Sequence, residues 1–420
     1  MELAALSDLG MRRLNNQDSV TVVQEADLRC SRGHFLMVAD GMGAHAAGEL
    51  ASKMAVDFVP LAYRKALDLS PPAALRKAVH DANDAIYAKG QSSPDLHGMG
   101  TTCSCLALLD RWALVAHVGD SRVYRLRGST WEQLTFDHSL VWEMAAANQT
   151  TADKIPACIP KNVITRSLGP HPKVNVDLEG PHTMEPGDVF LLCSDGLSGV
   201  VEDELIGAIV GAMPPNEAAQ SLVDLANLRG GPDNISIVIA RVGEPAPSSL
   251  GEAATTVAQA ATAVIQPWVW TVGAVCLAGL MWFSSKDLTL GVFASGLGLA
   301  AAMFIGMMQR HRWDLPDGPT SLGGPYGNGP YRQWTCAAGE AATAALLKVV
   351  DELGALESSA LDADYLSGVD WEPFHAERKH ADAARANGNH AECLAGYSAA
   401  IRALMGQVRN RSSAATVVAR

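Results

Sequence analysis

Four aspartates stand at the ends of short apolar runs, each next to or close to a glycine, and their type and spacing could do chemistry: Asp40, Asp120, Asp195 and Asp233. A single Asp-Gly pair is explained equally well by a tight turn. Carboxylates at several strand ends that converge in space would instead offer the hard oxygen ligands that Mg2+ and Mn2+ prefer. The recurring pattern therefore predicts a site for divalent cations, provided that the strands bring the four acids together.

The stretch around Asp40 carries the clearest form of this pattern. An apolar run of strand length, Phe35 to Ala39, leads into Asp40 and Gly41, and a helix start is expected at Ala46. The glycine leaves its backbone carbonyl unobstructed, so both this carbonyl and the carboxylate could reach a cation. The alternative is an ordinary turn between a strand and a helix, and this stretch alone does not separate the two.

A polar segment near the N-terminus adds a cation and a further acid. Arg13 precedes Asn16, Gln17 and Asp18 within the segment SDLGMRRLNNQDS. An arginine fork matches the geometry of a phosphate group, and a carboxylate a few residues later could reach metal-bound water. The alternative interpretation is a polar loop without a chemical role.

Apolar periodicity predicts the elements that must position these residues. Strands are expected over 103–109, 112–118, 189–193 and 235–240, a packing helix over 72–90, and a helix followed by a mobile flap over 139–163. His138 is interpreted as a hydrogen-bonding loop residue rather than a metal ligand, because no other histidine stands at ligand spacing.

Composition excludes some classes of protein and favours others. The formal net charge of −13 and the absence of long Lys/Arg runs argue against nucleic acid as a partner. The eight cysteines include no CxxC pair and are expected to be reduced core residues, which suggests a reducing compartment. The N-terminal residues MELAALSD show no secretory signal. A hydrophobic content of 48% in 420 residues suggests that the chain contains more than a soluble core.

Eight motifs in order resemble the bacterial branch of the metal-dependent protein phosphatases, the protein phosphatase 2C family: SDLGMRRLNNQDS, VADGMGAHAAGE, GMGTT, HVGDSR, LTFDHS, VITRSLG, LLCSDGLSG and GGPDNISIV. The resemblance covers about residues 1–243. It implies an α+β fold of two stacked antiparallel sheets flanked by helices, which composition and periodicity alone do not indicate.

The resemblance also implies roles for individual residues. Asp40 would bridge two Mn2+ or Mg2+ ions, with the Gly41 carbonyl on one ion and Asp195 and Asp233 on the other. Asp18 would hold coordinated water, and Arg13 would bind the substrate phosphate. Asp120 would help to bind a weaker third ion, and Asn234 would shape the Asp233 loop. Two such ions lower the pKa of a bridging water so that it can attack phosphorus, and no nucleophilic side chain is needed.

Two positions depart from the family pattern. Gln17 stands where many members have Glu; an amide can still hydrogen-bond metal-bound water but lacks the charge, which predicts weaker binding of the second metal. Met42 stands where animal members place a proposed acid histidine, and that role is not transferred to His45. The general acid for the leaving group therefore stays open.

Beyond residue 243 the composition changes. A small-residue linker is expected over 244–263, a transmembrane helical hairpin over 264–308, and a Gly/Pro-rich linker over 309–334. The hairpin consists of two nearly uncharged stretches of about 20 residues, the length that spans a bilayer; the alternative is a buried soluble hairpin. Arg310 and Arg312 outweigh Lys286 in the turn, which predicts a bacterial inner membrane protein with both flanking domains in the cytoplasm.

The C-terminal residues 335–420 are predicted to be a helical tail. Helices are expected over 341–353, closed by Gly354, over 375–386, and after the turn Asn387-Gly388-Asn389. The last pair is either one tetratricopeptide-like unit or a plain helical hairpin. In either case the tail could bind a protein partner.

Together these features predict a membrane-anchored serine/threonine protein phosphatase that opposes a kinase in the same pathway. Its substrates would be phosphoproteins, and the bilayer would be its anchor. Two alternatives stay open: a membrane scaffold that binds phosphoproteins without turnover, and a metal-dependent hydrolase of small phosphate esters.

Overall fold

The computed structural model describes residues 1–25, 32–43, 46–148, 154–156, 159–160, 163–243, 322–336, 339–358 and 368–418. Its strands form two antiparallel sheets. One sheet has the order β1-β11-β10-β7-β8-β12, and the other has the order β2-β3-β5-β6-β9 with β4 paired to β3. The strands are β1 (Glu2–Asp8), β2 (Asp18–Val23), β3 (His34–Met42), β4 (Gly100–Thr101), β5 (Cys103–Leu109), β6 (Trp112–Val118), β7 (Arg122–Arg127), β8 (Thr130–Gln133), β9 (Asp177–Thr183), β10 (Val189–Cys193), β11 (Ile235–Arg241) and β12 (Arg332–Thr335).

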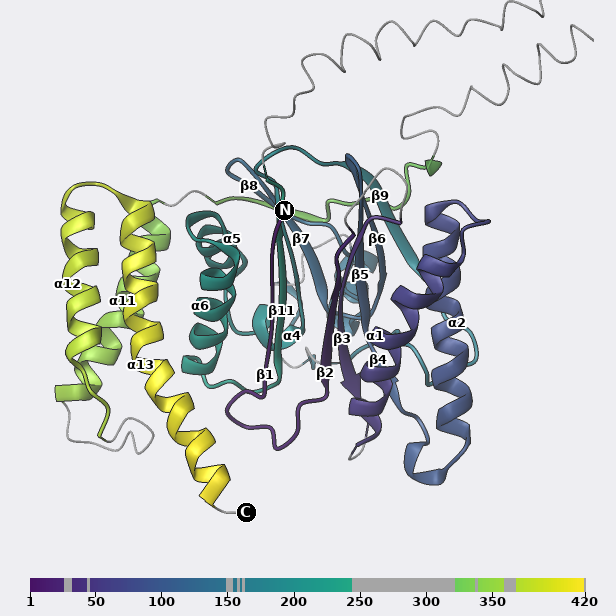
Figure 1. Ribbon diagram of the computed structural model, residues 1–420, viewed down its shortest axis with the longest axis horizontal. Coiled ribbons are helices and arrows are strands. Elements are labelled where there is room, and N and C mark those ends of the chain that lie inside the picture. Colours follow the sequence, from purple (N-terminus) through teal and green to yellow (C-terminus); the bar gives the residue numbers. More distant parts are fainter. Residues whose placement is uncertain are drawn as a thin grey trace, which may run out of the picture. The chain divides into compact units, whose positions relative to one another are not determined.

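Helices cover the outer faces of both sheets. Figure 1 shows α1 and α2 on the side of the second sheet and α5 and α6 on the side of the first. The helices are α1 (Ala47–Lys65), α2 (Pro71–Gln91), α3 (Leu140–Ala147), α4 (Asp195–Ser198), α5 (Asp203–Ala212), α6 (Pro215–Leu228), α11 (Glu340–Ser358), α12 (Glu372–Ala386) and α13 (His390–Val418), with a 3-10 turn at Pro94–Leu96.

The central strands are buried on both faces, which explains why they read as continuous apolar runs. In β10, Leu191 and Cys193 face the core beneath α5 and α6, whereas Phe190 and Leu192 face the core between the two sheets. β11 alternates in the same way. The α+β sandwich of two antiparallel sheets with flanking helices, predicted from the resemblance, is therefore confirmed.

Several predicted elements match the structure closely. The strands at 103–109, 112–118 and 189–193 have the predicted bounds, and the helix predicted over 72–90 is α2. β3 is longer than predicted, because it continues through Asp40 and Gly41 to Met42, where β4 pairs with it. Asp40 thus lies inside a strand rather than at its tip.

The C-terminal segment is more closely joined to the sandwich than the sequence suggests. Residues Met1–Glu244 and Gly324–Arg420 form one compact unit. The linker predicted to run to residue 334 is wrong in its last residues, because Arg332–Thr335 form β12 and pair with β8. Gly354 does not close its helix either, since α11 continues to Ser358.

The helical tail packs against α5 and α6, the helices that cover the first sheet. Leu394, Ile401 and Leu404 of α13 are fully buried in one apolar cluster with residues of α5, α6 and β11. Arg402 of α13 donates a hydrogen bond to Ser221 Oγ of α6 at 2.6 Å. The apolar face of α13 is therefore packed against the chain's own helices, and binding of a partner by the tail stays a prediction.

The predicted membrane hairpin at 264–308 and the linker at 244–263 lie outside the described residues, as does His45. None of the helices in the described ranges combines the length and the apolar composition that a membrane crossing requires.

Candidate metal centre

The pairing of β2 with β3 places two of the predicted site acids side by side. Asp18 is the cross-strand partner of Asp40, and the Thr102 hydroxyl accepts a hydrogen bond from the Asp40 backbone at 2.8 Å. The backbone of Gly41 passes so close to the chain that a Cβ atom would lie 2.1 Å from the carbonyl oxygen of Gly48. Only glycine fits there, so the site requires this residue for a steric reason.

The other three acids come from segments at the ends of strands of the first sheet, β10, β11 and β7. Asp195 is the first residue of α4, directly after β10, and Asp233 lies in the loop before β11. Asp120 lies in the turn between β6 and β7. The four acids from the recurring pattern, together with Asp18, therefore meet at one end of the sandwich.

The pKa values of Asp18, Asp40, Asp120 and Asp195 are all raised by burial and by neighbouring carboxylates. Burial, and then the charges of Asp18, Asp195, Asp120 and Asp233, raise the pKa of Asp40 well above its usual range, although its side chain keeps partial contact with solvent. Burial raises the pKa of Asp18 to about 6 and that of Asp120 to about 8, and in both cases the charge of Asp195 adds to the effect. Such crowding of like charges is unfavourable unless cations compensate it.

The carboxylate oxygens of this cluster fit divalent cations. The Oδ1 atoms of Asp18, Asp120 and Asp195 are buried and have no hydrogen-bond partner in the described part of the protein. Unpaired buried oxygens are costly, and hard cations prefer such ligands. Among the described residues, no group of three acidic, histidine or cysteine side chains stands close enough to hold one ion.

A guanidinium group supplies part of the missing positive charge. Arg13 Nη2 forms an ion pair of 2.6 Å with Asp233 Oδ2, and the arginine side chain is 48% exposed. Arg13 therefore contacts one of the predicted metal ligands and remains accessible to a phosphate group.

Asn234 connects the two loops that carry Arg13 and Asp233. Its Oδ1 atom accepts a hydrogen bond from the Gln17 backbone at 2.8 Å, and its Nδ2 atom donates to the carbonyl oxygens of Leu9 and Asn15. The Gln17 side chain donates to the carbonyl oxygen of Gly43 at 3.4 Å. These bonds fix the backbone of the 9–17 loop beside the acids.

Three supporting residues were not assigned to the site from the sequence. Ser194 Oγ donates to Asp18 Oδ2 at 2.8 Å, and Thr102 orients the backbone of Asp40 as described above. His138 accepts a hydrogen bond from the Gly119 backbone at 2.9 Å through Nδ1, next to Asp120, and its Nε2 atom lies 2.8 Å from Asp177. The interpretation of His138 as a hydrogen-bonding residue is confirmed; the neighbouring motifs GMGTT and SDG were the available signals for Thr102 and Ser194.

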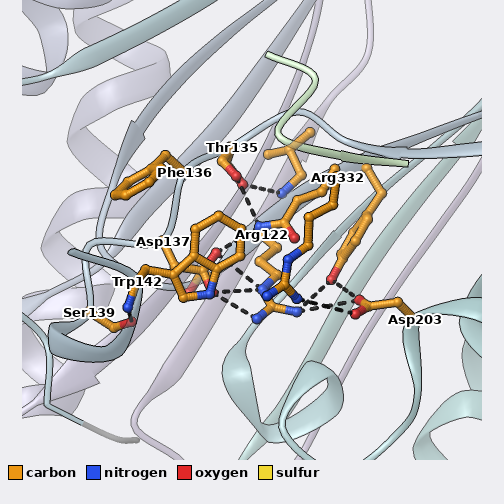
Figure 2. A network of polar contacts seen from close by, with 12 residues as sticks. Arg122, Thr135, Phe136, Asp137, Ser139, Trp142, Asp203 and Arg332 are labelled. Atoms are coloured by element: carbon orange, nitrogen blue, oxygen red, sulfur yellow. Dashed lines mark hydrogen bonds and ion pairs between the residues drawn. The ribbon is translucent and has the colours of Figure 1, made fainter. Parts of the chain in front are cut away.

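A cavity of about 550 Å³ opens next to the acids. Asp120 and Asp195 lie along it, and its walls come from the start of α3, from residues 198–203 between α4 and α5, and from Arg122 and Arg332. Figure 2 shows the polar network in this region, with Arg122 at its centre between Asp137 and Asp203.

Comparisons with known proteins agree with this geometry. The family model described as protein phosphatase 2C matches residues 11–226, about half of the chain. The chain belongs to the protein phosphatase 2C family. It is 37% identical over 249 residues to protein phosphatase PhpP of Streptococcus pneumoniae, a match that covers 58% of this chain and 98% of the relative.

Solved structures of family members are similar to the same part of the chain. The serine/threonine phosphatase PstP/Ppp of Mycobacterium tuberculosis has 35% sequence identity and a TM-score of 0.51, and the match covers 58% of this chain and 99% of that one. The catalytic domain of PstP in complex with two manganese ions has 36% identity and a TM-score of 0.50, over 58% of this chain and 98% of that one. The predicted enzyme class, serine/threonine protein phosphatase, is thereby confirmed. β12 and the helices of the tail lie outside the residues that the family model matches.

Proposed function

We propose that this protein hydrolyses phosphoserine and phosphothreonine in proteins, with two Mn2+ or Mg2+ ions, while anchored to the bacterial inner membrane. The observation that carries the catalytic part is the meeting of five aspartates around buried, unpartnered carboxylate oxygens. That donor set suits hard divalent cations and has no evident use without them. The manganese ions in the structure of the similar PstP catalytic domain support the same choice of metal.

Each site residue then has a defined task. Asp40, the Gly41 carbonyl, Asp195 and Asp233 hold the ions, and Asp18 orients water beside them while Ser194 fixes the Asp18 carboxylate. When bound, two such ions make water acidic enough to attack phosphorus near neutral pH. Asp120 adds a ligand for a weaker third ion.

Arg13 binds the phosphate group of the substrate in this proposal. In this structure its guanidinium pairs with Asp233 through Nη2 at 2.6 Å, and its side chain is 48% exposed, so its other N–H groups would be available to phosphate oxygens. The arginine thus offsets negative charge on the phosphoryl group during transfer, a reaction in which positioning and electrostatics dominate catalysis.

Membrane anchoring by residues 264–308 rests on the apolar character of that sequence. The proposed hairpin has two spans, and an even number of spans is compatible with the single compact unit that Met1–Glu244 and Gly324–Arg420 form. Both flanking parts then lie on one side, in the cytoplasm, where phosphoprotein substrates and an opposing kinase would meet them. Recovery of the full-length chain from cells without detergent, in the soluble fraction, would contradict this anchoring.

The decisive test of the activity uses the full-length chain in detergent. Phosphate release from phosphothreonine and phosphoserine peptides is measured while Mn2+ is titrated, with chelator as one control and Asp40→Asn as another. We expect metal-dependent turnover that Asp40→Asn and Asp195→Asn abolish. A folded Asp40→Asn variant with the wild-type rate would refute the two-metal assignment, and turnover of small phosphate esters without turnover of peptides would refute the protein substrate.

A further inference from the structure

The strand β12 joins the catalytic sandwich from a part of the chain that lies outside the family match. It pairs with β8 in the register Arg332↔Gln133 and Trp334↔Trp131, and so becomes the edge of the first sheet. Tyr331, just before it, donates a hydrogen bond from its hydroxyl to Glu179 Oε1 at 2.6 Å. These bonds place residues 331 and 332 at a defined position beside the cavity.

Tyr331 contacts the segment just before α3, and Arg332 contacts the beginning of α3 itself. The rings of Tyr331 and Phe136 meet edge to face, with their centroids 5.5 Å apart. The guanidinium carbon of Arg332 lies over the Trp142 indole, 4.4 Å from the ring centroid. Phe136 and Trp142 also contact each other at 5.2 Å. Residues 331 and 332 therefore hold one wall of the cavity in place through aromatic packing.

Arg332 also lines the cavity itself, as Figure 2 shows from close by. Its Nη1 atom lies 3.9 Å from Asp203 Oδ2, whereas the Tyr124 hydroxyl donates to Asp203 Oδ1 at 2.6 Å. Arg122 is held by Asp137, with Nη2 at 2.8 Å from Oδ2. Two guanidinium groups thus stand opposite Asp137 and Asp203, and Glu202, which also lines the cavity, is paired with Arg229, so the charges of this wall are largely paired.

The cavity leads from this wall to the metal acids. Asp120 and Asp195 line it together with Arg332, and its volume of about 550 Å³ lies within the range of about 300–1,000 Å³ found for ligand sites. A phosphate group at the metal centre would fill only one end. The remainder has room for residues next to the phosphorylated one.

We infer that Arg332 is a specificity-determining residue, which contacts the part of a phosphopeptide that flanks the phosphorylated side chain and favours an acidic residue there. This inference rests on the proposed phosphatase activity. An arginine that is stacked on an indole and 24% exposed at its side chain is held in one orientation yet remains accessible to a carboxylate. Arg332, which the sequence predicted to lie in a linker, would then form part of the substrate site.

The test measures the activity of the full-length protein with Mn2+ on two kinds of substrate. The first is p-nitrophenyl phosphate, which has no flanking residues. The second is a pair of phosphothreonine peptides that differ only in whether a flanking residue is Glu or Lys. Variants are Arg332→Ala, Arg332→Lys, and Gln333→Ala as the matched control. Gln333 is the next residue of β12, and its side chain donates to Glu132 rather than lining the cavity.

We expect Arg332→Ala to lower the ratio of kcat/KM for the Glu peptide over the Lys peptide by about fivefold, the size of one partly exposed ion pair. The loss should arise in KM for the Glu peptide, with a much smaller change for p-nitrophenyl phosphate. Arg332→Lys should restore part of the ratio because it keeps the charge, and Gln333→Ala should leave the ratio as in the wild type.

Two results would overturn the inference in distinguishable ways. If the wild type hydrolyses both kinds of substrate and Arg332→Ala leaves the ratio unchanged, or lowers activity on ester and peptides equally, Arg332 does not determine specificity. If the wild type hydrolyses neither substrate with metal present, the proposed phosphatase activity fails and the inference fails with it.

Discussion

Replacing Asp40 by Asn should stabilise the metal-free protein while it abolishes metal binding. Asp40 lies opposite Asp18 on the neighbouring strand, and the charges of three further aspartates reach it. Each like-charged neighbour in such a site costs on the order of 1 kcal/mol. Because Arg13 offsets part of this repulsion, we expect the neutral amide to raise the free energy of unfolding by about 1–3 kcal/mol in chelator.

A second buried aspartate provides a matched control with the opposite sign. Asp188 is 1% exposed and receives two hydrogen bonds from Arg127, at 2.8 and 2.7 Å, and one from the Glu185 backbone at 2.8 Å. Its charge is paired, so Asp188→Asn removes a favourable interaction and should lower the free energy of unfolding by about 1–3 kcal/mol. The same change of side chain thus has opposite effects at two positions.

The assay is thermal unfolding of the full-length protein, followed by the intrinsic fluorescence of its tryptophans, in chelator and in a Mn2+ titration. A change of 1 kcal/mol shifts Tm by roughly 2–4 °C in a domain of this size. The wild type and Asp188→Asn should both gain stability with Mn2+, by about 2.7 kcal/mol at a hundredfold excess over Kd. The Asp40→Asn variant should have a higher Tm than the wild type in chelator, and its Tm should rise little with Mn2+.

The reasoning fails if Asp40→Asn lowers Tm in chelator as Asp188→Asn does, since the carboxylates would then not repel one another. It also fails if Asp40→Asn keeps the full rise of Tm with Mn2+, since Asp40 would then not be a metal ligand.

Three further predictions concern the same unit. In chelator, burial raises the pKa of Asp120 to about 8 in the folded protein, so the folded state keeps a proton that the unfolded state has lost. The free energy of unfolding should therefore fall as pH rises from 6.5 to 8.5, by up to about 1.4 kcal/mol per pH unit. Denaturant titrations at several pH values measure this slope, and Asp120→Asn should reduce it. An unchanged slope would contradict the raised pKa of Asp120. Ser194→Ala removes the hydrogen bond to Asp18 and should weaken Mn2+ binding about 10–100-fold by calorimetry, and unchanged affinity would rule out this supporting role. Leu404→Ala should lower the free energy of unfolding by about 2–5 kcal/mol, because Leu404 is buried in the cluster that α13 shares with α5 and α6. It should also lower the temperature at which catalytic activity is lost. If α13 unfolds in this variant while activity is fully retained, the tail folds independently of the catalytic sandwich.

The strands and the site motifs could be predicted because their signals are local. β5, β6 and β10 are apolar runs, interrupted only by Ser104 and His117 and bounded by turn residues, so their bounds follow from the sequence alone. The order of the motifs carried the resemblance, and with it the sheet architecture. Five aspartates could be named as one cluster without coordinates, although the prediction placed Asp40 at a strand tip and the structure places it inside β3.

Supporting contacts were harder to predict, because a hydrogen bond between distant segments leaves no periodic trace. Ser194 meets Asp18 across 176 residues of sequence, and His138 meets Gly119 only because the strands on either side turn back on each other. Polar residues of this kind look like ordinary loop residues until the fold brings their partners close.

The sequence by itself determined the site acids and the individual strands, since acidic motifs and apolar runs are written into consecutive residues, and the order of its motifs carried the resemblance that implied the catalytic sandwich. Only the tertiary structure decided that residues 332–335 complete the first sheet and that the helices after them cover α5 and α6. The four residues of β12 have no apolar alternation that separates them from the glycines and prolines before them. Their strand exists because the exposed edge of β8 offers hydrogen bonds to it, and that edge exists only in the folded protein.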